Sequence, residues 1–247
     1  MEKSNIDLCI VATLRPEILK RTIVSFFKHI TYVGGINLCI NIDCVPKYKD
    51  HGKREQCIND IGVICGMAAQ IFKKNCKSFI VTDGFNFSAA VKRLWVNTKS
   101  DYVFHLEDDW EFIKDIDLNE CIERMNNEDF DYMRFPKKNA PHLNRLWKVA
   151  LQPSLWRGNV VRELAEHMKT DKDPEKQLRI GQGNKKLDKI LTRIQKKGLK
   201  DYCSEWCCQD IGREWREEQG LIKWNAVEPE KVSKNNQNAK NITWWEK

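Results

Sequence analysis

The sequence predicts an α/β protein with a mostly parallel sheet that helices cover on both faces. Short apolar runs alternate with longer segments whose apolar residues recur at helical spacing. Strands and helices that alternate in this way form βαβ units, which place helices on both faces of a parallel sheet. Polar or acidic residues directly follow three of the runs. Because ligands bind at the carboxyl ends of parallel strands, these residues also point to a binding site.

Four apolar runs in the first half are typical of short buried strands. They cover residues 6–12, 38–44, 78–82 and 102–106. The segments between them have apolar residues at helical spacing and predict helices at residues 17–30, 57–73 and 86–95. The turn Thr13-Leu14-Arg15-Pro16 separates the first strand from the first helix, and proline is favoured near a helix start.

The second half has a weaker pattern. Strand-like runs occur at residues 131–135 and 150–155, and helices are predicted at residues 160–168, 185–197 and 203–218. The segment 185–197 is basic and amphipathic, and its apolar positions at helical spacing are Leu187, Ile190, Leu191 and Ile194. The residues beyond Glu230 are rich in Asn and Lys, which predicts a polar tail.

Composition predicts a soluble, cytoplasmic protein. The chain has 247 residues and is 41% hydrophobic, which is ordinary for a globular protein. No stretch approaches the roughly 20 apolar residues of a membrane span, and the first apolar run is too short for a signal peptide. The ten cysteines fall on apolar patterns, where free Cys behaves as a small hydrophobe. We therefore expect reduced thiols and no disulfide scaffold.

The acidic triplet Glu107-Asp108-Asp109 directly follows the run at residues 102–106. Three adjacent carboxylates repel one another unless they share a cation, and Mg²⁺ and Mn²⁺ prefer oxygen ligands and keep positions open for phosphate. The triplet therefore indicates a site for a metal ion and a diphosphate. A solvated acidic turn explains the same residues, and the triplet alone leaves both interpretations open.

The net charge of +7 is concentrated in one segment. Residues 168–200 hold eleven Lys and Arg against four Asp and Glu, a surplus of seven that leaves the rest of the chain close to neutral. This basic block predicts contact with a polyanion, and a solvated helical face explains it equally well.

In their order and spacing, the predicted strands, helices and motifs resemble the nucleotide-diphospho-sugar transferase fold called GT-A, in particular its large inverting family 2. Residues 10–16 resemble the T-x-R-P opening loop of that family. Asp43 lies at the end of the next strand, and residues 86–93 are similar to the helix that precedes the acidic motif. Glu107-Asp108-Asp109 resembles the D-x-D signature of GT-A enzymes. The resemblance covers about residues 6–215, and no single motif in it is specific.

The resemblance implies one GT-A domain over residues 1–230, followed by a polar tail at residues 231–247. Residues 1–112 would form the nucleotide-sugar-binding half, and residues 113–230 the helical, acceptor-side half. The implied reaction is metal-dependent transfer of a hexosyl or pentosyl group, with inversion favoured. The sugar would pass from a nucleoside-diphosphate sugar, with UDP expected, to an acceptor hydroxyl.

The resemblance also implies roles at the donor site. Asp109 would bind Mn²⁺ or Mg²⁺ directly, and Glu107 would contact the ribose or sugar, although Glu stands where Asp is commoner. Thr13 and Asp43 would contact the nucleotide base, and Arg15 would lie near the phosphates. The remaining candidates for nucleotide-sugar binding are Asn86, Lys92 and Asp108.

Residues 209–213, Gln-Asp-Ile-Gly-Arg, resemble the E-D-x-x-x-x-R-like element that supplies the base of inverting members. Asp210 is the first candidate for the carboxylate that takes the acceptor proton. The family's Glu is replaced by Gln here, so Glu205 is the second candidate, on the same expected helix. The candidate acceptor contacts are Arg213, Trp110 and Trp156. Both tryptophan rings could stack on a sugar or base, and core packing explains them equally well.

The acceptor has two competing interpretations. The basic block favours a polyanion, for example a hydroxymethylated base in DNA. A glycan or protein hydroxyl fits comparably well.

Other functional classes fit less well. A nucleotidyltransferase should carry a glycine-rich phosphate loop, and residues 13–16 contain no glycine. A metal-dependent nuclease would use the same acids without a nucleotide sugar. A plain nucleic-acid-binding module leaves the polar residues at successive strand ends unexplained.

Overall fold

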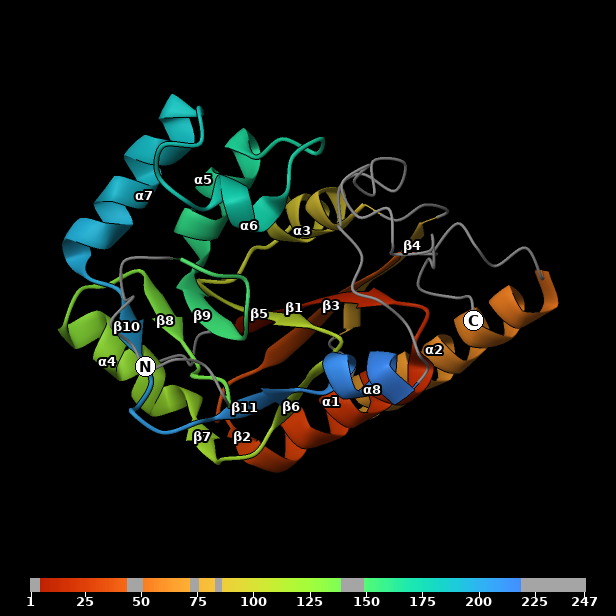
Figure 1. Cartoon of the computed structure of the whole chain (residues 1–247). Helices are drawn as coiled ribbons and strands as arrows, with labels where there is room; N and C mark the ends of the chain where they lie inside the picture. Colours follow the sequence, from red (N-terminus) through yellow and green to blue (C-terminus); the bar gives the residue numbers. More distant parts are fainter. Residues whose placement is uncertain (1–4, 44–50, 72–75, 83–85, 139–148, 219–247) are drawn as a thin grey trace.

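The computed structural model describes residues 5–43, 51–71, 76–82, 86–138 and 149–218 (Figure 1). The strands are β1 (Ile6–Thr13), β2 (Ile30–Thr31), β3 (Ile36–Asp43), β4 (Cys76–Thr82), β5 (Tyr102–Glu107), β6 (Trp110–Phe112), β7 (Ile116–Asp117), β8 (Tyr132–Arg134), β9 (Ser154–Arg157), β10 (Lys200–Asp201) and β11 (Cys208–Asp210). The helices are α1 (Pro16–His29), α2 (His51–Ile71), α3 (Phe87–Val96), α4 (Leu118–Asn127), α5 (Gly158–His167), α6 (Pro174–Gln177), α7 (Lys185–Lys197) and α8 (Ile211–Glu218).

A seven-stranded sheet with the order β10-β8-β9-β5-β1-β3-β4 forms the centre of the described structure. Strand β9 is antiparallel to its neighbours β5 and β8, and the other pairings in this sheet are parallel. Two small ribbons accompany it, an antiparallel β11–β6 pair and a parallel β2–β7 pair. The predicted fold class, a mostly parallel sheet flanked by helices, is confirmed.

The two faces of the sheet bury separate hydrophobic cores. Along β1, Leu8 and Ile10 belong to the core that α1 and α2 cover, whereas Cys9 and Val11 belong to the core under α3, α5 and α7. This alternation is what a strand with both faces covered requires. Figure 1 shows α1 and α2 on one side of the sheet and α3 and α5 on the other.

Helix α7 begins and ends at the residues that the sequence predicts. Its four predicted apolar residues are buried, and it packs against α5. The Asn184 side chain caps the helix by accepting a hydrogen bond from the Leu187 amide (3.3 Å). Helix α4 was missed, although its signal is present in the sequence. Asp117 caps it, and the buried residues Leu118, Cys121 and Met125 recur at helical spacing.

The helix predicted at residues 203–218 is wrong in its first half. Residues 208–210 form β11 and pair with β6, so that Asp210 lies opposite Trp110 and Cys208 opposite Phe112. Only Ile211–Glu218 is helical. Pairing with a strand about one hundred residues earlier overrides the local helical spacing, as tertiary context often does.

No helix of the described residues is long and apolar enough to cross a lipid bilayer. The polar tail predicted at residues 231–247 lies outside the described residues.

Trp156 is part of the core and not of an acceptor site, which corrects the sequence-based interpretation. Its side chain is 0% exposed in β9, and its ring centroid lies 4.4 Å from that of Tyr132 and 5.4 Å from that of Trp95. Its indole nitrogen donates a hydrogen bond to the Ser154 hydroxyl (2.8 Å). A ring enclosed in this way has no open face for a ligand.

Trp156→Ala is expected to lower the free energy of unfolding by about 3–5 kcal/mol, because it removes a fully buried aromatic ring and leaves a cavity. Urea denaturation of wild type and variant measures the change. Trp206→Ala is the control, since Trp206 is 40% exposed and its loss should change stability by roughly 0.5 kcal/mol or less. An equal effect of the two substitutions would show that Trp156 is not packed as described.

Candidate active site

The carboxyl ends of β1, β3 and β5 meet at one edge of the sheet. In the register of the strands Thr13 lies opposite Asp43, and Val11 lies opposite Glu107. The amide of Asp108 donates to the Val11 carbonyl oxygen (2.9 Å), which extends this contact past the end of β5. The polar residues that the sequence places after three different strands are therefore brought together.

A buried ion pair joins two of these strand ends. The Arg15 guanidinium contacts both carboxylate oxygens of Asp108, and Arg15 and Asp108 are only 4% and 2% exposed. Asp108 also accepts hydrogen bonds from the amide (2.9 Å) and the hydroxyl (3.3 Å) of Thr13. Burial alone would lower the pKa of Arg15, but the charges of Asp108 and Asp109 outweigh it and raise that pKa.

This pair changes the interpretation of three predicted donor contacts. Thr13, Arg15 and Asp108 are each less than 9% exposed, and their polar groups bind one another. The expected positions of Arg15 near the phosphates and of Asp108 at the nucleotide sugar stay predictions. These side chains hold the loop after β1 against the loop after β5.

Asp109 lies between Arg15 and the start of α8. Its carboxylate is 3.3 Å from the Arg15 guanidinium, and its carbonyl oxygen accepts a hydrogen bond from the Ile211 amide (3.0 Å). A Cβ atom at Gly212 would come within 2.2 Å of the Asp109 carboxylate, so the close approach of α8 requires a glycine. The positive end of a helix dipole near a carboxylate favours its charged form.

Glu107 stands at the centre of an acidic cluster. Its pKa is raised well above the ordinary value by burial first, and then by the negative charges of Asp109, Glu175, Asp108 and Asp210. A cation bound here would relieve this repulsion. The cluster thus combines the acidic triplet with Glu175 and Asp210, which lie 66 and 101 residues after Asp109.

Asp43 holds the start of α3 at the same edge. Its carboxylate accepts hydrogen bonds from the Thr82 hydroxyl (2.6 Å) and the Asn86 amide (2.9 Å), and the Arg93 guanidinium lies 3.4 Å away. It is 1% exposed, and burial raises its pKa. Asp43 is therefore bonded to other residues of the described structure, and its contact with a nucleotide base stays a prediction.

Asn86 and Lys92, predicted as donor contacts, are also engaged with the backbone. The Asn86 side chain caps α3 through the Ala89 amide (2.8 Å). The Lys92 ammonium donates to the carbonyl oxygen of Met168 (2.8 Å), just after α5. Both side chains set the position of α3 at the edge of the sheet.

Asp210 and Arg213 come close to the cluster through β11 and α8. One carboxylate oxygen of Asp210 accepts a hydrogen bond from the Arg213 amide (3.0 Å), so Asp210 also caps α8. The Arg213 side chain is exposed. Strand β11 is held to β6 by its ladder and by a hydrogen bond from the Gln209 amide group to the Glu111 carboxylate (2.6 Å).

Glu205 does not share a helix with Asp210, which corrects the second base assignment. It lies in the turn before β11 and forms an ion pair with Lys114, beyond the far end of β6. Because β11 and β6 run antiparallel, this end of the ribbon lies away from Asp109 and Asp210. Glu205 is exposed, and the bond to Lys114 lowers its pKa.

Trp110 is also less accessible than an acceptor contact needs to be. It is 5% exposed and belongs to the core under α1. Its indole nitrogen has no hydrogen-bond partner among the described residues, and the Lys137 ammonium lies 5.5 Å from its ring centroid. The prediction that its ring stacks on an acceptor is corrected for this reason.

No family model matches the chain, and a search of curated proteins finds no match. Solved structures do match. The mannosyltransferase PcManGT from Pyrobaculum calidifontis, in complex with GDP-Man and Mn²⁺, has a TM-score of 0.54 at 9% identity, over 88% of this chain and 61% of that chain. TarS 1-349 of S. aureus in complex with UDP has a TM-score of 0.51 at 9% identity, over 83% of this chain and 60% of that chain. The chain has the GT-A glycosyltransferase fold.

The structure of TarS 1-349 in complex with UDP-GlcNAc matches equally well, with a TM-score of 0.51 at 6% identity, over 90% of this chain and 60% of that chain. The chain thus spans less than two thirds of the length of these structures. At such low identity the likeness establishes the fold, and the activity has to be argued from the site.

The acidic cluster of this GT-A fold is suited to a hard divalent ion that is shared with a ligand. The described residues do not gather three carboxylate, imidazole or thiol groups into a complete metal site. Asp109, the last residue of the triplet, has a partly exposed carboxylate. Carboxylate oxygens are the ligands that Mg²⁺ and Mn²⁺ prefer. Mg²⁺ commonly binds through one or two carboxylates and completes its shell with substrate phosphates and water.

Glu175 is the member of the cluster that the sequence analysis missed. It lies in the first turn of α6, a short helix that Asp173 caps and Pro174 begins. An Asp-Pro pair of this kind is a helix-start signal that could have located α6. The effect of the Glu175 charge on the pKa of Glu107 depends on tertiary packing and has no signal in the sequence.

Two basic surfaces flank the GT-A core. In the basic block, Arg193 pairs with Glu163 and Lys197 with Asp129 and Asp131, so the end of α7 is largely neutralised. Seven exposed cationic residues that precede Arg193 in the basic block form no ion pair among the described residues: Lys169, Lys172, Lys176, Arg179, Lys185, Lys186 and Lys189.

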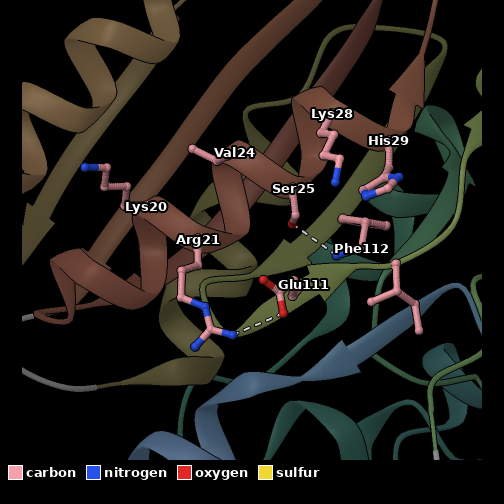
Figure 2. Close-up of a pocket in the computed structure, with 9 residues that line it drawn as sticks. Lys20, Arg21, Val24, Ser25, Lys28, His29, Glu111 and Phe112 are labelled. Atoms are coloured by element: carbon pink, nitrogen blue, oxygen red, sulfur yellow. Dashed lines mark hydrogen bonds and ion pairs between the residues drawn. The ribbon is translucent and has the colours of Figure 1, made fainter.

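The second basic surface is a groove between α1 and β6, with a volume of about 630 Å³. Figure 2 shows Arg21 reaching from α1 to the Glu111 carboxylate (3.1 Å), with Lys20 and Lys28 on the same helix. One acid thus faces several cationic groups in this groove.

Glu107→Gln is expected to raise the melting temperature at pH 8 in the presence of EDTA. A folded-state pKa above the unfolded value means that wild type loses stability as pH rises from the ordinary Glu pKa, about 4, through the raised pKa. The glutamine cannot ionise and avoids this loss. Differential scanning fluorimetry from pH 4 to pH 9 measures the difference, which should vanish near pH 4. The matched control is the exposed Glu166→Gln; a stabilisation no larger than in this control contradicts the crowding of Glu107.

Proposed function

We propose that the protein is a metal-dependent glycosyltransferase that moves a hexosyl or pentosyl group from a UDP-sugar to an acceptor hydroxyl. The observation that carries this proposal is the acidic cluster of Glu107, Asp109, Glu175 and Asp210 at the carboxyl edge of a GT-A sheet. A ligand that brings a divalent ion with a diphosphate matches the charge of such a cluster. The UDP and GDP-Man complexes of the matched structures support a nucleotide-sugar donor.

Asp109 would hold the metal ion, and Glu107 beside it would face the ribose or sugar. When bound, Mn²⁺ or Mg²⁺ would act as a Lewis acid that neutralises the leaving diphosphate. The chain positions Asp109 through Arg15 on one side and the start of α8 on the other. The Mn²⁺ in the PcManGT complex supports this choice of ion.

A carboxylate of the cluster would take the proton of the acceptor hydroxyl as that oxygen attacks the anomeric carbon. This arrangement favours an inverting reaction, in which the base lies on the face opposite the leaving diphosphate. Asp210 is the base that the sequence motif suggests, with the exposed Arg213 on the next turn as an acceptor contact. A catalytic base has to lie where the acceptor hydroxyl can reach its carboxylate.

A polyanionic acceptor, such as DNA with a hydroxymethylated base, is supported by the basic surfaces. Seven exposed cationic residues of the basic block have no acidic partner among the described residues. Each contact with a phosphate would release counterions and make binding depend on salt. A glycan or protein acceptor would not require this arrangement. A metal-dependent nuclease would use the acids but leaves the GT-A fold unexplained.

Binding of the donor can be tested by thermal stabilisation. UDP, UDP-GlcNAc and GDP-Man are added with and without Mn²⁺, and the melting temperature is measured. A nucleotide at 100 times its dissociation constant stabilises the native state by about 2.7 kcal/mol, so at least one should raise the melting temperature only with Mn²⁺. Asp109→Asn should abolish this shift, whereas the partly exposed Asp188→Asn on α7 should not. If no nucleotide changes the melting temperature of wild type, the proposed donor is contradicted.

A polyanionic acceptor can be tested by the salt dependence of DNA binding. A fluorescein-labelled single-stranded DNA 20-mer should bind wild type with an affinity that falls steeply between 50 and 200 mM NaCl, which fluorescence anisotropy measures. The triple variant Lys185→Ala, Lys186→Ala, Lys189→Ala should reduce the slope of log affinity against log salt by about 2, at roughly 0.7 for each lost phosphate contact with a single strand. The double variant Lys20→Ala, Lys28→Ala tests the groove between α1 and β6 (Figure 2) as the alternative DNA-binding surface. Binding that does not respond to salt favours a neutral glycan or protein acceptor.

A further inference from the structure

The turn that leads into β11 brings two thiols together. The Sγ atoms of Cys203 and Cys207 lie 3.4 Å apart, and neither residue is part of a disulfide. Both Sγ atoms also face the carbonyl oxygen of Glu205, at 3.3 Å and 3.6 Å, so the two side chains point to the same side of the turn. A disulfide bond is about 2.05 Å long, and the two sulfur atoms therefore need to come closer by roughly 1.4 Å.

Backbone hydrogen bonds fix this turn at both ends. Just before it, the Tyr202 amide donates to the Arg134 carbonyl oxygen (2.9 Å). At its end the Cys207 amide donates to the Pro136 carbonyl oxygen (2.7 Å), and the Cys207 carbonyl oxygen accepts a hydrogen bond from the Ile113 amide (2.9 Å). The short separation of the two sulfur atoms thus belongs to a turn that the neighbouring strands hold in place.

Cys203 has the surroundings of a reactive thiol. It is partly exposed, and the Lys114 ammonium lies 3.9 Å from its sulfur. Reactive thiols occur in partly exposed, electropositive surroundings. Cys207 is 0% exposed, and burial raises the pKa of its thiol. An oxidant from solvent therefore reaches Cys203 first, and Cys207 stands next to the product.

The adjacent Cys208 is not part of this pair. It is 0% exposed, and its Sγ atom faces the carbonyl oxygens of Phe135 and Pro136, at 3.6 Å and 3.7 Å. A structural zinc site needs four ligands, and the described residues hold no group of three His, Cys, Asp or Glu that could bind a metal ion. Two sulfur atoms in contact, without further ligands, fit the formation of a disulfide better than a zinc site.

We propose that Cys203 and Cys207 form a redox-active dithiol that a peroxide oxidises to an intramolecular disulfide. The Cys203 sulfur attacks one oxygen of hydrogen peroxide, the O–O bond breaks, and the leaving oxygen takes the thiol proton and departs as water. The Cys207 sulfur then attacks the resulting sulfenic acid, the S–S bond forms, and the sulfenic oxygen leaves as a second water. The two thiols lose two electrons and two protons, which reduce one peroxide to two waters.

The disulfide fastens the end of β11 that lies away from the acidic cluster. The bond between Cys207 and Ile113 ties this end to the residue that follows β6, and at the other end of the ribbon Asp210 lies opposite Trp110. Oxidation therefore acts on the turn that precedes the strand with the proposed base. The inference concerns the thiols alone and does not depend on the reaction that the acidic cluster supports.

The test follows the thiols in one tryptic peptide, residues 201–213, which contains the pair and Cys208. The full chain is treated with hydrogen peroxide, unfolded in iodoacetamide, digested and analysed by mass spectrometry. Without peroxide the peptide should carry three alkyl groups. With peroxide it should carry one, at Cys208, and alkylation of Cys203 and Cys207 should fall by about tenfold or more, because disulfide sulfurs offer no thiolate to the reagent. Dithiothreitol added before iodoacetamide should restore all three groups.

Two controls accompany this measurement. In Cys203→Ser the same peptide should keep both remaining thiols open to alkylation after peroxide, because Cys207 has lost its partner. Cys9 and Cys39 lie opposite each other in the register of β1 and β3 and are 0% and 7% exposed. This second pair should stay fully alkylated in the same samples, since peroxide reaches it only through the core.

Three alkyl groups after peroxide would overturn the proposal. A disulfide that joins two chains, or one that joins Cys207 to Cys208, would overturn it as well, and fragmentation of the peptide distinguishes these cases. Sulfinic acid at Cys203 beside an unmodified Cys207 would have the same consequence, because it would show that the second thiol does not reach the first.

Discussion

The buried ion pair between Arg15 and Asp108 is the contact on which the site depends. It joins the loops after β1 and β5, which are separated by more than ninety residues of chain. Loss of one partner of a buried pair leaves an uncompensated charge and costs about 3–5 kcal/mol, so these residues are strongly constrained. Because Asp108 is occupied, the outer acids Glu107 and Asp109 are the ones that remain to face a ligand. The three adjacent acids thus have different tasks.

The late part of the chain completes the site through a glycine. Strand β11 pairs with β6 and delivers α8 against Asp109, where only the missing side chain of Gly212 allows contact. The amides at a helix start carry partial positive charge, which complements the carboxylate of Asp109. A region about one hundred residues beyond the triplet therefore packs against its last acid.

The features that the sequence predicted are those with local signals. The strands that end at Thr13, Asp43 and Glu107 are continuous apolar runs, and α7 has an apolar stripe, so periodicity was enough. A strand-like run was predicted at residues 150–155, but the antiparallel pairing of β9, the β6–β11 ribbon and the burial of Trp156 depend on contacts between distant segments, which leave no local pattern. The same holds for the site. The acidic triplet was found as a motif, but the burial of Arg15 and its ion pair with Asp108 arise only from packing.

Charge is distributed in a way that suits an anionic ligand with a cation. The acidic cluster alone would repel a diphosphate, so binding requires positive charge from a metal ion and from the protein. The end of α7 cannot provide it, because Arg193 and Lys197 are paired with acids. The exposed lysines before it, among them Lys172 and Lys176, flank Glu175 at the start of α6. Long-range attraction to such residues would concentrate an anion near the acidic cluster. The basic block and the acidic cluster are thus parts of one electrostatic arrangement.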